Sequence, residues 1–317
     1  MTNSLLKNIA LFGLIFFSLG MVKAERELGA LPSIIKYVLS DSVIEERSPL
    51  EQVLEAYQDP SSEHIFVAAH RGGKQFDDLE MVPGNSIANI ENAIGKGFDL
   101  YESDIEILGD GTLIVFHDDH FNDLTNSNVP DDFLDNANIA YAKSLFLTYD
   151  NGGVSSERIP TLLEFLTAAK DKIMIKFDLK SGTFGASTLI EIFEMVETTE
   201  TTEQVLIRGG ANLLNVADSN GYDTRIIMRR YNSMPSVQEI TDLVDNYDVR
   251  AISIPNGVGP DVLTAANAAG LVVEIHELDE FTDTDRQNAI NDGVRQFHSF
   301  KPSTLLEYLE LNGFREF

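Results

Sequence analysis

The sequence predicts an α/β fold, a closed (β/α)8 TIM barrel with an N-terminal helical extension and one extra hairpin strand after strand 2. From residue 65 onward, short and continuously apolar runs alternate with stretches whose apolar residues recur at helical spacing. Continuously apolar strands that alternate with helices form parallel sheets covered on both faces. Eight such strands in a chain of 317 residues favour a closed barrel, and a doubly wound open sheet is the alternative.

The first 24 residues have the pattern of a secretory signal peptide. A lone cation, Lys7, precedes an apolar run, and small residues stand at 22 and 24 before the expected cleavage site. The run is shorter than the ~20 residues that a membrane-spanning helix needs, although an uncleaved anchor remains the alternative. We therefore expect export to the periplasm or the extracellular medium.

Residues 25–62 are predicted to form a helical extension that serves packing, and residues 63–317 the barrel domain. The stretch "SPLEQVLEAYQ" carries apolar residues at helical spacing, with Ser48 and Pro49 as its cap and first turn.

The barrel strands follow in order, and each except the last is expected to be followed by a helix. The second strand turns at residues 109–111 into a hairpin partner, "TLIVFHD". Residues 121–158 are expected to form a long polar loop, and loops of this length usually have a functional role. The eight predicted strands are "IFVAAH", "DLYESDIEIL", "IMIKFDLK", "QVLIRGG", "TRIIMRR", "VRAISIP", "LVVEIHEL" and "VRQFHSF".

The composition narrows the possible partners. There are 51 acidic and 23 basic residues, a formal charge of −28, which disfavours binding to nucleic acid or an anionic membrane. The chain has no cysteine, so it has neither disulfides nor a zinc–thiolate site. In such an acidic chain, a local cluster of His, Arg and Lys is informative.

Polar residues interrupt the apolar runs near the strand ends, where barrel enzymes place their active sites. We expect several of them to converge on one mouth. These residues are His70, Arg71, Glu102, Asp104, His117, Asp178, Lys180, Arg208, Arg229, Arg230, His276 and Glu277.

Three of these acids suggest a cation site. Glu102 and Asp104 are two residues apart on one strand and therefore share a face, and Asp178 lies on the next strand. Three hard oxygen donors suit Mg²⁺ or Ca²⁺ better than a soft metal. The alternative is that each acid simply pairs with a neighbouring base.

Two histidines flank these acids. A single histidine at a strand end is more often structural, but His70 and His117 together have the character of a general acid and a general base. Arg71 and Lys180 would supply positive charge for an anion, and the two glycines after Arg71 leave room for a ligand. This combination suits phosphate ester chemistry.

In this order the motifs resemble those of the glycerophosphodiester phosphodiesterases, from about Val67 to Pro302. The matching stretches are "HRGG" at 70, "PGNS" at 83, "YESDIEILGDGTLIVFHDD" at 101, "RIPTLLEFL" at 158 and "IKFDLK" at 175. The resemblance implies a barrel of the phospholipase C-like phosphodiesterase type. It also implies cleavage of diesters such as glycerophosphocholine to glycerol phosphate and an alcohol.

The same resemblance assigns roles to residues. It implies one divalent cation, Mg²⁺ or Ca²⁺, held by Glu102, Asp104 and Asp178. It implies that His70 and His117 exchange protons, with Arg71 and Lys180 on the phosphate.

The chain departs from the family pattern at four places. Gly84 stands where the family's turn usually carries Glu, and Asp178 replaces a Glu. "HELD" at 276 replaces Trp-Thr-Val-Asn, and "SFKP" at 299 replaces Thr-Asp-x-Pro. We therefore expect conserved catalysis with an altered leaving-group side.

Two other functions stay open. "FDLKSGT" is similar to a strand of the sphingomyelinase D phospholipases of spider venom, which implies a lipid substrate and a cyclic phosphate product. The other is a barrel that binds phosphodiesters without turnover. The expected partner is thus a small-molecule or lipid phosphodiester.

Overall fold

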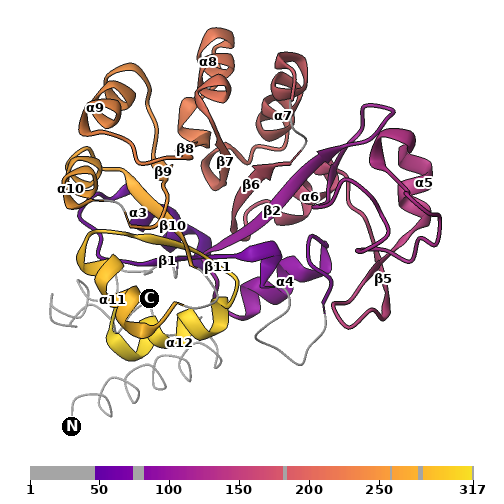
Figure 1. Ribbon diagram of the computed structural model, residues 1–317, viewed down its shortest axis with the longest axis horizontal. Coiled ribbons are helices and arrows are strands. Elements are labelled where there is room, and N and C mark those ends of the chain that lie inside the picture. Colours follow the sequence, from indigo (N-terminus) through magenta and orange to yellow (C-terminus); the bar gives the residue numbers. More distant parts are fainter. Residues whose placement is uncertain (1–46, 74–81, 181–183, 258, 278–280, 316–317) are drawn as a thin grey trace, which may run out of the picture. The chain divides into compact units, whose positions relative to one another are not determined.

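The computed structural model describes residues 47–73, 82–180, 184–257, 259–277 and 281–315. Within these ranges, a ring of parallel strands is surrounded by helices (Figure 1). The strands are β1 (Phe66–Ala69), β2 (Leu100–Ile107), β3 (Leu113–Val115), β4 (Phe146–Thr148), β5 (Val154–Arg158), β6 (Met174–Leu179), β7 (Val205–Gly209), β8 (Ile227–Arg230), β9 (Ala251–Ser253), β10 (Val272–Glu277) and β11 (Gln296–Ser299).

The α-helices are α3 (Pro49–Gln58), α4 (Ala88–Gly95), α5 (Ile139–Ser144), α6 (Leu162–Ala169), α7 (Ala186–Thr198), α8 (Ala211–Asn220), α9 (Val237–Asn246), α10 (Pro260–Ala268), α11 (Asp283–Asn291) and α12 (Pro302–Asn312). Short 3-10 turns are η3 (His70–Gly72), η4 (Leu134–Asn136), η5 (Thr202–Gln204) and η6 (Thr224–Ile226). None of the helices in the described ranges is both long and apolar enough to cross a membrane.

The barrel is closed. The strands follow the order β1-β11-β10-β9-β8-β7-β6-β2, and β1 pairs with β2 to complete the ring. All these pairs are parallel, whereas β3 lies antiparallel on β2. The predicted (β/α)8 barrel and its extra hairpin strand are therefore confirmed, and the open doubly wound sheet is excluded.

Strand register positions the site. In the β2–β6 pair, Glu102 lies beside Lys176 and Asp104 beside Asp178. The next pair sets Asp178 beside Arg208 of β7. Paired residues in a sheet point to the same face, so these charged side chains share the barrel interior.

An apolar layer closes the opposite, N-terminal end of the barrel. Helix α3 begins with a capping box in which Ser48 and Glu51 satisfy each other's backbone N–H groups. Its buried face packs on residues at the strand starts: Phe66, Ala68, Leu100, Met174, Leu206, Met228, Ala251 and Val272. The predicted helix at Ser48–Pro49 thus has the packing role expected of it.

The compact unit formed by these contacts runs from Ser48 to Phe317. Helix α3 lies within this unit, and the predicted division into residues 25–62 and 63–317 stays a prediction. The predicted signal peptide and residues 25–46 lie outside the described residues, so that part of the domain organisation stays a prediction.

Two expectations about secondary structure were wrong. The stretch from 121 to 158 is not a bare loop: it contains η4, α5 and the β4–β5 hairpin, held by a small core of their own that includes Phe116, Phe121 and Leu147. The last strand is also followed by a helix, α12. The sequence contains signals for this helix: Pro302 lies in its first turn, and Gly313, which adopts a left-handed conformation, follows its last residue.

A buried carboxylate connects β1, the start of β2 and the C-terminal segment. Asp99, just before β2, accepts hydrogen bonds from the Val67 amide of β1 at 2.8 Å and from Arg315 Nη1 at 2.7 Å. His64 Nε2 lies 3.1 Å from its other oxygen. Burial alone would raise the pKa of Asp99, but the His64 hydrogen bond and the Arg315 charge lower it below its usual value.

We expect Asp99→Asn to lower the free energy of unfolding by roughly 3–5 kcal/mol, because it leaves the buried partners of Asp99 uncompensated. Since the folded-state pKa is depressed, this stabilisation is present above the unfolded pKa and is lost as pH falls through the folded pKa. Urea unfolding across that range should show the variant's deficit shrinking with acidification. Asp218→Asn, on the exposed face of α8, is the control and should change little. A deficit that stayed constant with pH would contradict this account.

Candidate active site

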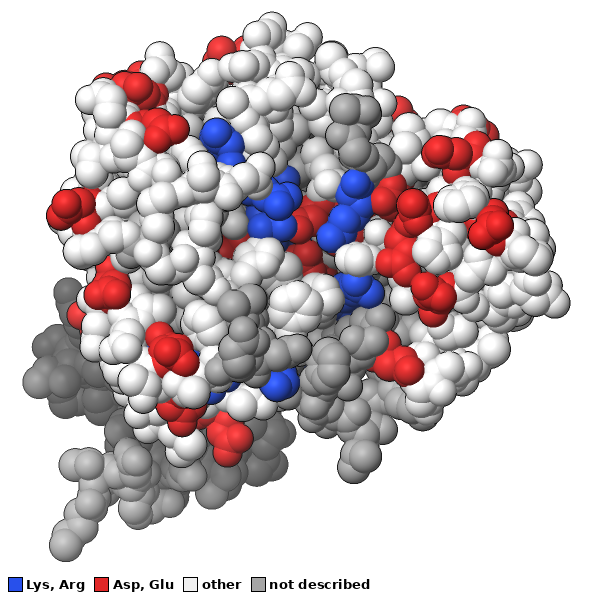
Figure 2. Space-filling view, viewed as in Figure 1, with Lys and Arg blue, Asp and Glu red and all other residues white. Residues whose placement is uncertain are grey.

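The candidate site lies at the C-terminal mouth of the barrel. Figure 2 shows Lys and Arg side chains gathered near the centre of this face, with acidic side chains recessed between them. Elsewhere on the same face the charged side chains are mostly acidic. The local cationic cluster expected of this acidic sequence is therefore present.

The three predicted metal ligands come together. Glu102, Asp104 and Asp178 each offer a carboxylate oxygen within 4.8 Å of the others. They are 1%, 0% and 5% exposed, so water screens their mutual repulsion poorly. The pairing of β2 with β6 produces this closeness, because it sets Asp104 directly beside Asp178.

Asp104 is incompletely neutralised. Lys180 Nζ lies 3.1 Å from its Oδ1, and Asn85 Nδ2 donates to Oδ2 at 3.0 Å. Even so, burial and the charge of Glu102 raise the pKa of Asp104 to about 6. A buried cluster of acids that resists full ionisation fits a hard divalent cation, which would supply the missing positive charge.

Asn85 is a residue that the sequence reasoning did not single out. It belongs to the quoted "PGNS" turn, adopts φ of 56°, and accepts a hydrogen bond from Ser103 Oγ at 2.9 Å. Its amide is thus held with the nitrogen toward Asp104. The "PGNS" motif marked this turn in the sequence, but only the fold showed which of its side chains contacts the acids.

Asp178 has a different environment. Arg208 donates to both of its oxygens, with Nε 2.5 Å from Oδ1. Burial favours the neutral acid, but the charges of Lys176 and Arg208 hold the pKa of Asp178 far below its usual value. The alternative of simple acid–base pairing therefore applies to Asp178, although each carboxylate oxygen keeps a second lone pair for a cation.

His70 lies at the end of β1 in a tightly constrained turn. Its ring centroid is 4.1 Å from that of Phe300 and 5.4 Å from that of His298. The following Gly72 has φ of 80°, and a Cβ there would come 2.2 Å from the Tyr101 ring. Burial lowers the pKa of His70 well below its usual value, which favours the neutral imidazole.

The two predicted phosphate-binding cations border the acids. The backbone N–H of Arg71 donates to Glu102 Oε2 at 3.0 Å, and its Nε lies 3.7 Å from Asp104 Oδ2. The side chains of Arg71 and Lys180 are 12% and 30% exposed, so both remain in reach of a ligand at the mouth.

His117 follows β3 and is half-buried. Its Nδ1 lies 2.5 Å from Asp118 Oδ1, a partner that the sequence reasoning did not assign although it is the next residue. His117 is close enough to Asp104 for its charge to lower that group's pKa. An acid on Nδ1 orients the ring and leaves Nε2 for chemistry.

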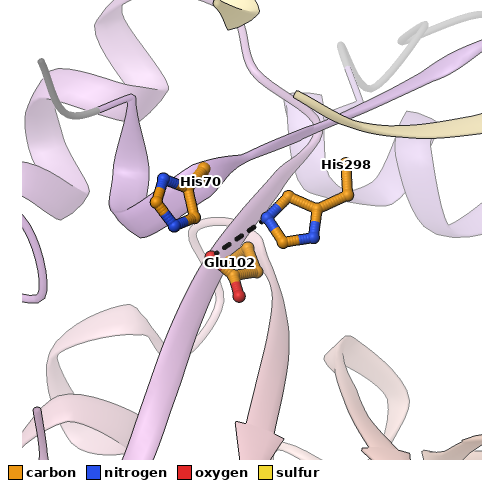
Figure 3. A group of neighbouring side chains, drawn as sticks. All are labelled: His70, Glu102 and His298. Atoms are coloured by element: carbon orange, nitrogen blue, oxygen red, sulfur yellow. Dashed lines mark ion pairs between the residues drawn. The ribbon is translucent and has the colours of Figure 1, made fainter. Parts of the chain in front are cut away.

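The sequence reasoning missed a buried polar group below the carboxylates. Figure 3 shows Glu102 between the rings of His70 and His298, with an ion pair drawn from Glu102 to His298. Their separation, His298 Nε2 to Glu102 Oε2, is 3.5 Å. Lys176 and Glu274, both 0% exposed, lie beside His298. These residues sit in the middle of apolar strands, where we expected only barrel wall.

The remaining strand-end residues have varied roles. His276 Nε2 lies 2.5 Å from Arg208 Nη1, and is thus joined to the site through the partner of Asp178. Arg229 instead packs over the Tyr231 ring, 4.4 Å from guanidinium carbon to ring centroid. The pKa of Arg230 is lowered by burial and by the charge of Arg208. The side chain of Glu277 lies outside the described residues.

Known proteins share this fold and parts of this sequence. A glycerophosphodiester phosphodiesterase of Caldanaerobacter subterraneus subsp. tengcongensis is 34% identical over 119 residues, which cover 37% of this chain and 46% of that relative. The match therefore spans about half the length of that curated relative.

Solved structures show the same barrel. A glycerophosphoryl diester phosphodiesterase from Parabacteroides distasonis superposes with a TM-score of 0.65 at 18% identity, covering 83% of this chain and 92% of that one. An Oleispira antarctica phosphodiesterase in complex with the product sn-glycerol-3-phosphate gives a TM-score of 0.64 at 20% identity, covering 79% and 99%.

The family assignment rests on a longer match. Residues 70–291 match the profile of the glycerophosphoryl diester phosphodiesterase family, from the histidine at the end of β1 to the end of α11. Because this match covers well over half of the sequence, the chain belongs to the glycerophosphoryl diester phosphodiesterase family.

Proposed function

We propose that this protein hydrolyses glycerophosphodiesters, such as glycerophosphocholine, to glycerol phosphate and an alcohol, with the help of one divalent cation. A single arrangement carries the proposal: in a member of this family, three buried carboxylates lie within 4.8 Å of one another, with His70 close to Glu102 and Lys180 beside Asp104. Residues 1–24 further support the proposal that it acts after export.

The cation would be held by Glu102, Asp104 and Asp178. Their oxygen-only donor set favours Mg²⁺ or Ca²⁺ over softer metals. When bound, such an ion would offset the negative charge on a non-bridging phosphate oxygen.

The chain's own residues would handle charge and protons. Arg71 and Lys180 would bind the phosphate from the mouth side. His70 and His117 form the acid–base pair: one takes a proton from the nucleophile as its oxygen bonds to phosphorus, and the other protonates the departing alkoxide. Asp118 would hold the His117 ring through Nδ1.

We expect His70→Ala and His117→Ala each to lower kcat by roughly 10²–10⁴-fold, because each removes one proton transfer. Initial rates on glycerophosphocholine under saturating substrate measure this. His120→Ala is the matched control, since His120 is a partly exposed neighbour of His117 that pairs with Asp119 and Asp123. Near wild-type turnover in either of the first two variants would end the proposal.

Chelation should abolish turnover, and Mg²⁺ or Ca²⁺ should restore it, because without a cation the three carboxylates would repel the anionic phosphate. Phosphorus NMR of the reaction with and without EDTA identifies the product at the same time. Glycerol phosphate supports the proposal. A cyclic phosphate would favour the phospholipase D-like alternative, and binding without turnover the non-enzymatic one.

A further inference from the structure

A buried ammonium lies within the barrel, close to the candidate cation site. Lys176 projects from β6 with none of its side chain exposed. Its Nζ lies 2.8 Å from Glu274 Oε2 and 3.0 Å from His298 Nδ1. Gln296 Nε2 also donates to that Glu274 oxygen, at 2.6 Å. A charge this deeply buried is retained at a cost unless its partners are fixed, so the geometry of those partners is informative.

The contact with Lys176 fixes the tautomer of His298. An ammonium group only donates hydrogen bonds, so the Nδ1 atom that faces it must be an acceptor. A ring nitrogen that accepts a hydrogen bond carries no proton, so the imidazole has a single N–H group. That proton therefore sits on Nε2.

The protonated Nε2 faces Glu102. It lies 3.5 Å from Glu102 Oε2, and Figure 3 shows the His298 ring directed at that carboxylate. The backbone N–H of Arg71 donates to the same oxygen at 3.0 Å. Glu102 Oε2 therefore accepts one hydrogen bond, from Arg71, and the His298 Nε2–H group faces it at ion-pair distance.

We propose that Lys176 and His298 are positioning residues for the cation site: Lys176 holds His298 in its Nε2–H tautomer, and His298 then holds the Glu102 carboxylate in place for the cation. This proposal rests on the cation site of the proposed function. It assigns work to two residues that touch neither the phosphate nor the cation. Partners of this kind, behind a metal ligand, typically change metal affinity by 10–100-fold.

The same contact excludes a competing metal site. His70, Glu102 and His298 offer ligand atoms within 4.8 Å of one another, and so do Glu274, His276 and His298. These mixed nitrogen and oxygen sets would suit a transition metal. A proton on His298 Nε2 and an ammonium on Nδ1 leave that ring without a lone pair for a metal, so the cation is confined to the carboxylates.

Two substitutions at one position separate this role from packing. His298→Gln keeps a carbonyl oxygen to accept from Lys176 and an amide to donate to Glu102. His298→Leu keeps similar volume and loses both. Calorimetric titration of the full chain with Mg²⁺, with Ca²⁺ in parallel, should give a dissociation constant roughly 10–100-fold weaker for the Leu variant and close to wild type for the Gln variant. Equal affinities in all three proteins would overturn the proposal.

Nitrogen NMR tests the tautomer in the wild-type protein itself, with one variant used only to assign the signals. With ¹⁵N-labelled histidine, the His298 signals, assigned by their loss in His298→Gln, should show protonated Nε2 and unprotonated Nδ1. The opposite pattern would overturn the proposal. If the three proteins show the expected order of cation affinities but the wild type does not cleave the diester, only the proposed function is contradicted.

Discussion

The interior of this barrel depends on charge compensation where water does not reach. Glu102, Asp104 and Asp178 repel one another in a poorly screened space, and an uncompensated buried charge is costly. The register of β2, β6 and β7 reduces this repulsion because it places a base next to an acid on the neighbouring strand. Lys176 lies beside Glu102, and Arg208 lies beside Asp178. A shift of one residue in either pair would turn the bases away from the acids.

Apolar packing at the N-terminal end of the barrel offsets the free-energy cost of the charges buried at the other end. Below the polar layer, side chains at the strand starts form a continuous apolar cluster with α3. The two layers meet at Gln296, which accepts from Tyr57 of α3 at 2.8 Å and donates to Glu274. The fold thus stabilises itself at one end of the strands and places its reactive groups at the other.

Two of the four places where the sequence departs from the family pattern, Asp178 and His276, are connected through Arg208. Arg208 donates to Asp178, and its Nη1 also lies 2.5 Å from His276 Nε2. His276 in turn packs against His298, with ring centroids 4.3 Å apart. Asp178 and His276, which are distant in the sequence, therefore belong to one group of contacting side chains that β6, β7, β10 and β11 contribute.

The sequence by itself determined the barrel and singled out most residues of the candidate site. Alternating strands and helices predicted the fold, and the two-residue spacing of Glu102 and Asp104 predicted a shared face whatever the tertiary context. Asp178, His70 and Arg71 were visible because polar residues at the ends of apolar runs stand out. The α12 helix also left signals, which the reasoning did not use.

Only the tertiary structure decided the roles of Lys176, Glu274 and His298. Both faces of a barrel strand are buried, so hydrophobic periodicity does not distinguish the side chains that point inward from those that pack under helices. A polar residue in mid-strand can be assigned only once register shows what lies beside it. Lys176 and His298 are 122 residues apart in the chain and 3.0 Å apart in space, a contact that exists only because the barrel closes.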